Sequence, residues 1–414
     1  MTRSKSKADA RRYDVILVGA TGYVGALIAD YLGGRAGGNA VRWAVAGRSA
    51  AKLEAVKAAL GTRGERVQVI VADTADRAAM DALAAQTKVV LTTVGPYAKY
   101  GSELVAACVD AGTDYCDLTG EAPWIAKMID LHQDAAAASG ARIVHCCGVD
   151  SIPSDLGVLF LNDEVRRRTG KPCSAIRMRV KSMKGGASGG TIASMMHLVE
   201  EAVRDPAVRA VLSNPYALNP KGARKGVRQP GAVPVTYDAA AGSWTAPFVM
   251  GAINSRVVQR SNALLDYAYG REFQYDEAML TGGGVLGAPA AVALTGAMGA
   301  FGLAAAFPPT RALLNRFVLP KPGEGPTAEQ RERGNYELLF VGTASDGRVF
   351  KALVAGDRDP GYGSTAKMIS EAALLLAETF GDADGGVLTP ASALGARLIE
   401  RLREHAGLTF QMVD

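Results

Sequence analysis

The stretch VGATGYVGALIADYL, residues 18–32, places three glycines between an apolar run and a segment with helical periodicity. Gly19, Gly22 and Gly25 have the spacing G-x-x-G-x-x-G. Glycine lets the chain turn sharply, and it lets a phosphate group approach the backbone amides at the start of the helix. A strand, a glycine turn and a helix in this order favour a nucleotide-binding site over a plain turn without a ligand. The residues expected to contact the nucleotide are Gly19, Ala20, Thr21, Gly22, Tyr23, Val24 and Gly25.

The first 150 residues alternate short apolar runs with helical stretches. The apolar runs are rich in β-branched side chains and cover residues 14–20, 41–48, 67–73, 88–95, 114–120 and 141–148. Short buried strands that alternate with helices form a parallel sheet with helices on both faces. Six strands in this rhythm predict a Rossmann fold, which binds dinucleotides at the carboxyl ends of its strands.

Beyond residue 152 the pattern changes. Strand-like segments recur at 175–183 and at 336–356, where Asp346-Gly347 predicts the turn of a hairpin. We therefore expect an α/β protein with a Rossmann doubly wound parallel sheet and a second α+β domain inserted before C-terminal helices. The expected parts are a disordered N-terminal tail (1–12), the Rossmann domain (13–152), a second domain that faces substrate or lipid (153–360) and the C-terminal helices (361–414).

The end of the second apolar run indicates which dinucleotide is bound. A site for NAD usually has Asp or Glu there, because a carboxylate accepts hydrogen bonds from the ribose hydroxyls. This chain instead has Arg48 and Ser49, in the sequence AGRS. A guanidinium group can pair with the 2′-phosphate that distinguishes NADP from NAD, so we predict NADPH as the cofactor. An exposed arginine without a ligand is the alternative. Asp73, at the end of the third run, either borders the adenine or caps the next helix.

The loop after the fourth run, TTVGPYAKYG at residues 92–101, lies by topology near the expected position of the nicotinamide. We expect Val94, Gly95, Pro96 and Tyr97 to contact the cofactor. The Tyr97 hydroxyl could donate a proton or bind a carbonyl oxygen of a substrate. It could equally do no more than pack the loop against the cofactor, and the sequence leaves both interpretations open.

Composition and charge exclude several classes of function. The net charge of +5 is small for 414 residues, and no stripe of Lys and Arg alternates with aromatic residues, so we expect no nucleic-acid partner. The five cysteines have no C-x-x-C spacing and the four histidines are scattered, so we expect neither a disulfide framework nor a metal site. The polar N-terminus has no secretion signal, and we predict a cytoplasmic protein.

Residues 278–310 contain no charged side chain. Glycine and alanine dominate this segment, and Pro289 with two glycine clusters is expected to interrupt a helix. We interpret it as a mobile apolar segment that covers an acyl chain or touches a membrane surface. The second of these would place the protein at the inner face of the plasma membrane. A pair of buried core helices is the alternative.

Several motifs resemble those of a known family. GATGYVG (19–25), VGPYAKYG (94–101), GTDYCDLTGE (112–121) and GVDSIPSDLG (148–157) are similar to motifs of the saccharopine dehydrogenase-like oxidoreductases. One branch of that family, the trans-acting enoyl reductases of mycobacterial polyketide-lipid synthesis, has motifs similar to SGGTIASMM (188–196), DPGYGSTAKMISEAALLLA (359–377) and GVLTPASALG (386–395). The resemblance extends from about residue 13 to the C-terminus.

This resemblance implies NADPH-dependent reduction of a carbon–carbon double bond in a lipid or polyketide chain bound as a thioester, with the enzyme acting in trans. The acyl chain would be the partner, free or on a carrier protein, and a homodimer stays open. The resemblance also implies that the C-terminal helices pack on the Rossmann domain. Two other interpretations remain: an NADP-linked oxidoreductase of a C–N bond, of the saccharopine dehydrogenase type, and a non-catalytic NADPH-binding protein of lipid surfaces.

Reduction of an enoyl thioester needs hydrogen-bond donors for the developing enolate oxygen and a proton for the α-carbon. We predict Tyr97, Tyr115 and Ser151 as the candidate catalytic residues. Ser151 precedes Pro153, so capping of a helix that starts there is the more conservative interpretation of this serine.

Two carboxylates follow the fifth apolar run. For Asp117 and Glu121, capping of the following helix and pairing with Lys or Arg are favoured over an acid–base role. His145, Cys146 and Cys147 fall in the pattern of the sixth strand, where inert thiols are expected. His145 could face the cleft, but a hydrogen-bonded core histidine is the more common case. The catalytic acid stays unassigned.

Overall fold

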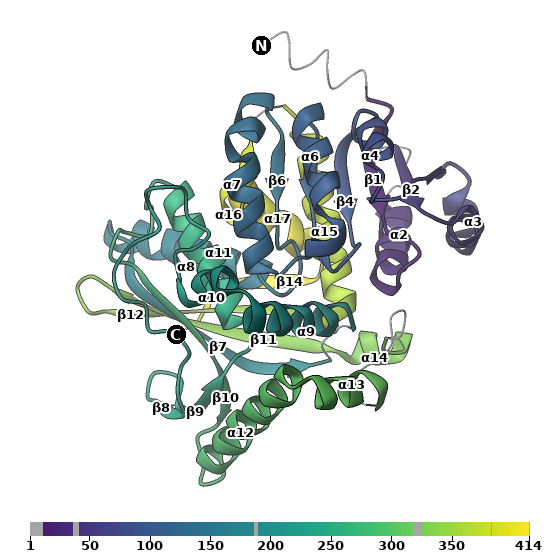
Figure 1. Ribbon diagram of the computed structural model, residues 1–414. Coiled ribbons are helices and arrows are strands. Elements are labelled where there is room, and N and C mark those ends of the chain that lie inside the picture. Colours follow the sequence, from purple (N-terminus) through teal and green to yellow (C-terminus); the bar gives the residue numbers. More distant parts are fainter. Residues whose placement is uncertain (1–10, 36–40, 186–188, 318–324, 382, 414) are drawn as a thin grey trace. The chain divides into compact units, whose positions relative to one another are not determined.

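The computed structural model describes residues 11–35, 41–185, 189–317, 325–381 and 383–413. Most of the predicted N-terminal tail, residues 1–10, lies outside them. The chain divides into two compact units, each built around a seven-stranded sheet (Figure 1). The first unit comprises Met1–Val149, Pro322–Gly325 and Tyr362–Ala406, and the second comprises Asp150–Lys321, Pro326–Gly361 and Gly407–Asp414.

The sheet of the first unit is parallel, and its strand order confirms the predicted Rossmann fold. The order is β13 (Gly386–Leu388), β6 (Arg142–Val144), β5 (Asp114–Cys116), β4 (Thr87–Thr92), β1 (Tyr13–Val18), β2 (Trp43–Gly47) and β3 (Gln68–Val71). Strand β1 reads YDVILV and is buried along its whole length, as expected of a central strand covered on both faces. Strand β13 was not predicted. It is as short as β5 and β6, but it lies outside the first 150 residues, where the alternation of apolar runs and helices indicated the strands.

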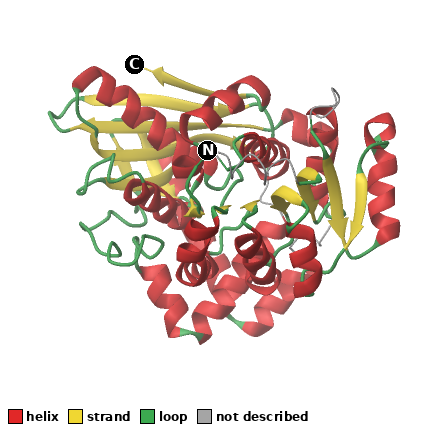
Figure 2. Cartoon of the chain, turned by 90° about the horizontal axis from the view of Figure 1, so that it is seen from above, coloured by secondary structure: helices red, strands yellow, loops and turns green. Residues whose placement is uncertain are grey.

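Helices pack against this sheet, and Figure 2 shows the helices and strands of the chain from above. Helices α4 (Arg77–Ala84), α6 (Ser102–Ala111) and α7 (Ala122–Ser139) form one row, and α2 (Tyr23–Arg35) packs on α15 (Thr365–Glu378). The carboxylate of Glu371 in α15 is enclosed, and it accepts hydrogen bonds from Tyr31 Oη and Arg35 Nε, both at 2.7 Å. Helix α15 also contacts β1, β4 and β5, so it belongs to the core of the first unit.

The sheet of the second unit is mixed. Its order is β14 (Leu408–Val413), β12 (Val349–Gly356), β11 (Asn335–Ala344), β7 (Cys173–Lys184), β10 (Gln274–Gly282), β9 (Ser243–Pro247) and β8 (Thr236–Asp238). Strands β7 and β10 are parallel, and the other neighbours are antiparallel. The predicted hairpin at Asp346-Gly347 is confirmed: it joins β11 to β12, and Gly347 has a φ of +85°.

Helices of the second unit pack on its sheet: α8 (Ile152–Thr169) contacts β7, β11, β12 and β14, and α11 (Gly251–Leu264) contacts β10. Helix α9 (Gly189–Arg204) packs on α10 (Pro206–Ser213). The region expected to hold the C-terminal helices therefore also supplies one strand to each sheet, β13 and β14. The alternating burial of Leu408, Thr409 and Phe410 in β14 is the period-two signal of a half-buried strand.

The apolar segment 278–310 differs from its expectation in two respects. Its first five residues complete β10, and Gly287–Ala306 form one continuous helix, α12. Pro289 does not interrupt the helix because it lies in the first turn, where the backbone N–H has no partner within the helix. Only Gly287, Ala291 and Ala305 of α12 are buried, which excludes a core helix.

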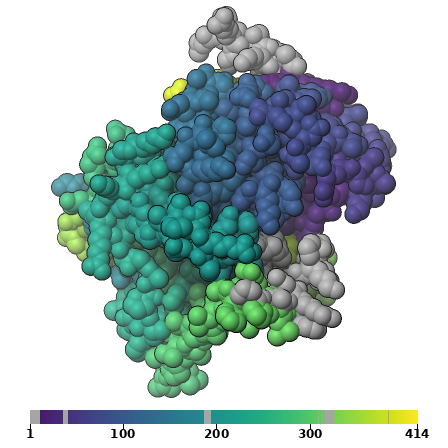
Figure 3. All heavy atoms as spheres, in the orientation of Figure 1, coloured from purple at the N-terminus to yellow at the C-terminus, as the bar shows by residue number. Residues whose placement is uncertain are grey.

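Much of the apolar surface around α12 is open to solvent. Val285 is 92% exposed, Leu303 76% and Val292 60%. Among the described residues, α12 is the one helix long and apolar enough to cross a membrane. Its most apolar stretch of 18 residues has a mean hydropathy of 1.5, and 11% of that stretch is buried. In Figure 3 its green atoms lie at the surface, at the bottom of the view.

Candidate active site

The turn between β1 and α2 is closely packed at two of its three glycines. Gly19 has a φ of +93°, and a Cβ there would lie 2.7 Å from Thr93 Oγ1. A Cβ on Gly25 would lie 2.1 Å from the carbonyl oxygen of Gly19. At Gly22 a Cβ would meet that same oxygen at 3.5 Å, an ordinary contact. Packing of the protein therefore does not require glycine at 22, whereas the close approach of a pyrophosphate does.

Arg48 follows the last residue of β2. Its side chain is exposed, and among the described residues it has no hydrogen bond or ion pair. The Ser49 hydroxyl accepts a hydrogen bond from the Lys52 backbone N–H and caps helix α3 (Ala50–Ala59). Asp73 accepts a hydrogen bond from the Ala75 backbone N–H at 3.1 Å, and the cap of α4 is Asp76. An unpaired guanidinium in this position fits the 2′-phosphate of NADP.

We expect Arg48→Ala to weaken NADPH binding about 10- to 100-fold while the affinity for NADH changes little, since the charged pair with the phosphate is lost. Fluorescence titration with both nucleotides measures this difference. Lys52→Ala is the matched control, because it removes an exposed positive charge four residues away. Equal losses for the two nucleotides would exclude the phosphate role of Arg48.

The loop after β4 is held by hydrogen bonds to the end of β4 and to the segment that follows β5. It contains a cis peptide bond between Gly95 and Pro96, and it leads into the short helix α5 (Tyr97–Tyr100). The Tyr97 hydroxyl donates a hydrogen bond to the Thr92 carbonyl at 3.3 Å and accepts one from the Leu118 backbone N–H at 3.1 Å. Burial raises the pKa of Tyr97 well above its ordinary value, and the nearby charge of Asp117 adds to this. The hydroxyl therefore ties the loop after β4 to the segment after β5.

Glu121 caps a helix, but not the one that was expected. Its carboxylate accepts hydrogen bonds from the backbone N–H groups of Tyr97 at 3.0 Å and Ala98 at 2.8 Å. It therefore caps α5, whereas α7, which begins at the next residue, receives no side-chain cap from it. Because 24 residues separate Glu121 from Tyr97, no local sequence pattern indicated this contact.

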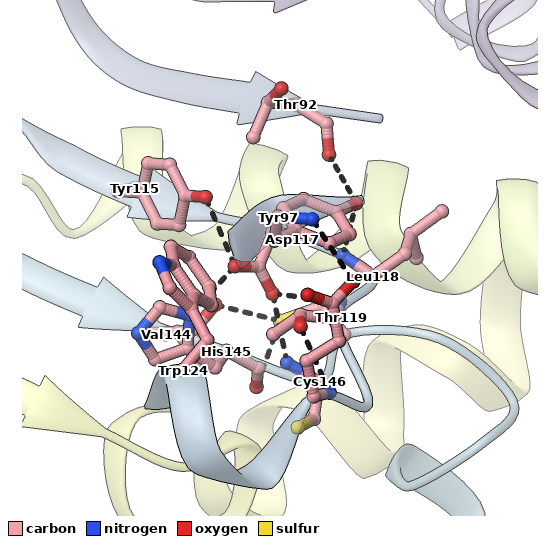
Figure 4. Close-up of polar contacts among 12 residues, drawn as sticks. Thr92, Tyr97, Tyr115, Asp117, Leu118, Thr119, Trp124, Val144, His145 and Cys146 are labelled. Atoms are coloured by element: carbon pink, nitrogen blue, oxygen red, sulfur yellow. Dashed lines mark hydrogen bonds and ion pairs between the residues drawn. The ribbon is translucent and has the colours of Figure 1, made fainter. Parts of the chain in front are cut away.

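Asp117 was expected to cap a helix or to pair with Lys or Arg, and it does neither among the described residues. Its Oδ2 lies 2.6 Å from Nδ1 of His145 and 3.0 Å from the hydroxyl of Tyr115 (Figure 4). Its Oδ1 accepts hydrogen bonds from the backbone N–H groups of Thr119 and Cys146, both at 3.1 Å. The carboxylate is completely buried.

His145 is buried and hydrogen-bonded, as expected of a core histidine, but it lies beyond the end of the strand and only one of its ring nitrogens has a partner among the described residues. Strand β6 ends at Val144, and Cys146 has a φ of +64°, so His145, Cys146 and Cys147 lie in an irregular segment and not in a strand. The imidazole packs edge-on against the rings of Tyr115 and Trp124, with centroids 5.8 and 5.1 Å away. Nε2 is buried and has no hydrogen-bond partner in the described part of the chain.

The three predicted catalytic residues separate into two groups. Tyr97 and Tyr115 both lie beside Asp117 in the first unit, and burial raises the pKa of Tyr115 well above its ordinary value. Ser151 lies in the second unit, where its hydroxyl donates to Asn254 Oδ1 at 2.8 Å. It precedes α8 without a side-chain cap bond, which corrects the expected capping role. Next to it, burial raises the pKa of Asp150 to about 6.

Comparison with known proteins agrees with the glycine turn and the strand order. The saccharopine dehydrogenase NADP binding domain family matches residues 15–144. A Mycobacterium tuberculosis protein with the provisional name of trans-acting enoyl reductase is 46% identical, covering 98% of this chain and 98% of its own. A trans-acting enoyl reductase of Mycobacterium bovis is 40% identical, covering 95% and 96%.

Among solved structures, apo saccharopine dehydrogenase (L-Glu forming) from Saccharomyces cerevisiae has the same fold. The TM-score is 0.53 at 14% sequence identity, covering 97% of this chain and 100% of that one. The predicted resemblance and the NADP cofactor are thereby confirmed. The chain belongs to the family of the mycobacterial trans-acting enoyl reductases, whose nucleotide-binding domain is of the saccharopine dehydrogenase type.

Proposed function

We propose that this protein is an NADPH-dependent reductase that acts in trans on the carbon–carbon double bond of an enoyl thioester in lipid or polyketide synthesis. The name of its relatives supports this, because the identity extends over nearly the full length of both chains. The observation that carries the proposal is the polar network at the carboxyl ends of β4, β5 and β6, in a domain that binds NADP. This edge of a Rossmann sheet is where ligands react.

When bound, NADPH supplies a hydride for the β-carbon. The residues of the chain then have to hold the cofactor, fix the loops around the reacting atoms and provide a proton. The glycine turn fits the pyrophosphate and Arg48 fits the 2′-phosphate. Tyr97 and Glu121 hold the loop after β4 through hydrogen bonds to both of its ends. A loop fixed in this way keeps the geometry of the site constant during turnover.

A reaction at a C–N bond, as in saccharopine dehydrogenase, is less well supported by the described residues. Its amino-acid substrate would require arginines that are free to bind carboxylates. Arg177 and Arg179 lie two residues apart on β7, but Arg179 is buried between Asp238 at 2.8 Å and Asp276 at 2.5 Å. Arg177 lies 3.6 Å from the same Asp238. Both guanidinium groups already have carboxylate partners within the second unit.

An apolar substrate agrees with the surface of the second unit. Helix α12 has no charged residue on any side, and Val292 and Leu303 are exposed on it. A flat protein partner would cover one side and leave the others in water, whereas the interface of a lipid layer can surround most of the helix. We propose that α12 contacts lipid, which would place the protein at the inner face of the cytoplasmic membrane, near acyl substrates that are free or held by a carrier protein.

The test of the proposed reaction is NADPH consumption by the purified protein with a long-chain 2-enoyl pantetheine thioester, with NADH in parallel. We expect NADPH-selective consumption and the saturated thioester as product, identified by mass. Consumption only with a keto acid and an amine would support the C–N oxidoreductase instead. Tight NADPH binding without turnover on any of these would support a non-catalytic protein of lipid surfaces.

A further inference from the structure

The imidazole of His145 is held at one nitrogen and left without a partner at the other. Nδ1 lies 2.6 Å from Oδ2 of Asp117, while Nε2 has no hydrogen-bond partner among the described residues although it is buried. A buried polar atom without a partner costs about 1–3 kcal/mol. A group that destabilises the fold in this way is typical of a functional site.

The carboxylate beside the imidazole is fixed on both of its oxygens. Oδ1 of Asp117 accepts the backbone N–H groups of Thr119 and Cys146, and Oδ2 accepts the Tyr115 hydroxyl as well as the imidazole (Figure 4). It cannot turn away without breaking these bonds. It therefore selects the ring form in which Nδ1 carries a hydrogen, so that proton exchange takes place at Nε2.

The neighbouring tyrosines are poor donors in comparison. Burial raises the pKa of both Tyr97 and Tyr115 well above the ordinary value. Their hydroxyl hydrogens are also used, by the Thr92 carbonyl and by Asp117. Histidine, in contrast, is the side chain that ordinarily gains and loses a proton near neutral pH.

We propose that His145 donates the proton of the reductase reaction from Nε2, and that Asp117 is the positioning residue that orients its ring. This inference rests on the proposed function. Hydride addition to the β-carbon breaks the π bond and leaves an enolate. The α-carbon then forms a bond to the proton, the Nε2–H bond of the imidazolium breaks, and its electron pair stays on the nitrogen. Solvent returns a proton to the imidazole before the next turnover.

Several titratable and aromatic groups face the ring. Asp117 lies against Nδ1, and Tyr115 donates a hydrogen bond to the same carboxylate oxygen. His132 on α7 interacts electrostatically with His145. Trp124 contributes an uncharged ring. Since the proton comes from the imidazolium, kcat is expected to fall at high pH, where a histidine ordinarily loses its proton.

The experiment compares His145→Gln with His405→Gln, a control that removes an exposed imidazole of the same unit outside this network. We expect His145→Gln to lower kcat about 100-fold or more, because a general acid contributes about that much. The dissociation constant of NADPH should stay within about twofold, as measured by titration. The fall of kcat at high pH should be present in the wild type and in His405→Gln and absent in His145→Gln. Added imidazole should restore part of the rate.

Asp117→Asn and Tyr115→Phe test the positioning role. Asp117→Asn should lower kcat about tenfold or more and change the tautomer of His145 seen in ¹⁵N NMR spectra of the imidazole. Tyr115→Phe removes the hydrogen bond that the tyrosine donates to Oδ2 of Asp117, so it should change the pH dependence of kcat. This variant keeps the imidazole, and it serves as the test if His145→Gln does not fold.

The outcomes separate this inference from the proposed function. A wild-type protein that reduces no enoyl thioester overturns both. Wild-type turnover with an unchanged kcat and pH profile in His145→Gln overturns the proton-donor role alone. A loss of kcat in His145→Gln that follows a matching loss of folded protein or NADPH affinity assigns His145 to structure and also overturns it. For Tyr115→Phe, a pH profile identical to that of the wild type is the contradicting result.

Discussion

Gly25→Ala is expected to lower the free energy of unfolding of the first unit by about 3 kcal/mol or more, with no NADPH binding that titration can detect. The new Cβ would lie 2.1 Å from the Gly19 carbonyl oxygen, 2.8 Å from its carbon and 2.9 Å from Cα of Ala20. All three are backbone atoms, so no side-chain rotation relieves the contact. The turn between β1 and α2 has to open, and with it the amides that fit a pyrophosphate. Thermal unfolding and a fluorescence titration measure the two effects.

Two other glycines of this region are the controls. Gly33→Ala lies in the same helix, where a Cβ meets its nearest atom at 3.5 Å, and it should stabilise the protein by about 0.5–1 kcal/mol. Gly22→Ala should unfold like the wild type but bind NADPH about tenfold more weakly, because its methyl group occupies space that the phosphates need. Wild-type stability and NADPH affinity in Gly25→Ala would contradict the close packing of the turn.

Charged residues on α12 are expected to abolish association with lipid vesicles. The double substitution Val292→Glu and Leu303→Glu removes two exposed apolar side chains, each worth about 1.5–3 kcal/mol on full burial, and adds two charges. Binding to vesicles of phosphatidylcholine with a minor fraction of phosphatidylglycerol should therefore fall at least about tenfold. Flotation of the purified protein with the vesicles measures this.

A matched control places the same charges elsewhere. Val71 on β3 and Val203 on α9 are both 60% exposed, as is Val292, and their double substitution by Glu should leave flotation unchanged. A wild-type protein that does not float, or a loss of flotation common to both double variants, would contradict the lipid contact. If the α12 variant instead turns a lipid-free dimer into monomers, as seen by light scattering, the helix is a contact between two copies.

Local sequence patterns were sufficient to predict most of the strands and helices of the first unit. The glycine turn follows a strand that is apolar throughout, so β1, the turn and α2 could be read from neighbouring residues. The hairpin at Asp346-Gly347 is equally local. One failure is strand β13, which is as short as β5 and β6 but lies far along the chain from the alternating pattern that indicated those two. The predicted interruption of a helix at Pro289 was wrong for another reason. Proline interrupts a helix in its interior but not in its first turn, where Pro289 lies.

The contact between Asp117 and His145 could have been predicted from the sequence, but only by combining the positions of the strand ends with the order of the strands in the sheet. Both residues were seen, each at the end of its own apolar run, and 28 residues separate them. Strands β5 and β6 are neighbours, with Cys116 opposite Val144, so the next residue of each strand lies at the same edge. The sheet order brings the two side chains together. By contrast, the cap that Glu121 forms on α5 depends on the path of the loop after β4, which no periodicity describes.

The interleaved C-terminus has a consequence for how the chain reaches its native state during synthesis. The chain leaves the first unit after Val149, returns briefly at Pro322–Gly325 and again at Tyr362, and leaves finally after Ala406. Strand β13 and helix α15 complete one sheet and its packing, and β14 completes the other. Neither half can finish folding while the last fifty or so residues are still inside the ribosome. Nascent chains stalled before Tyr362 should thus be sensitive to protease and depend on chaperones until translation ends.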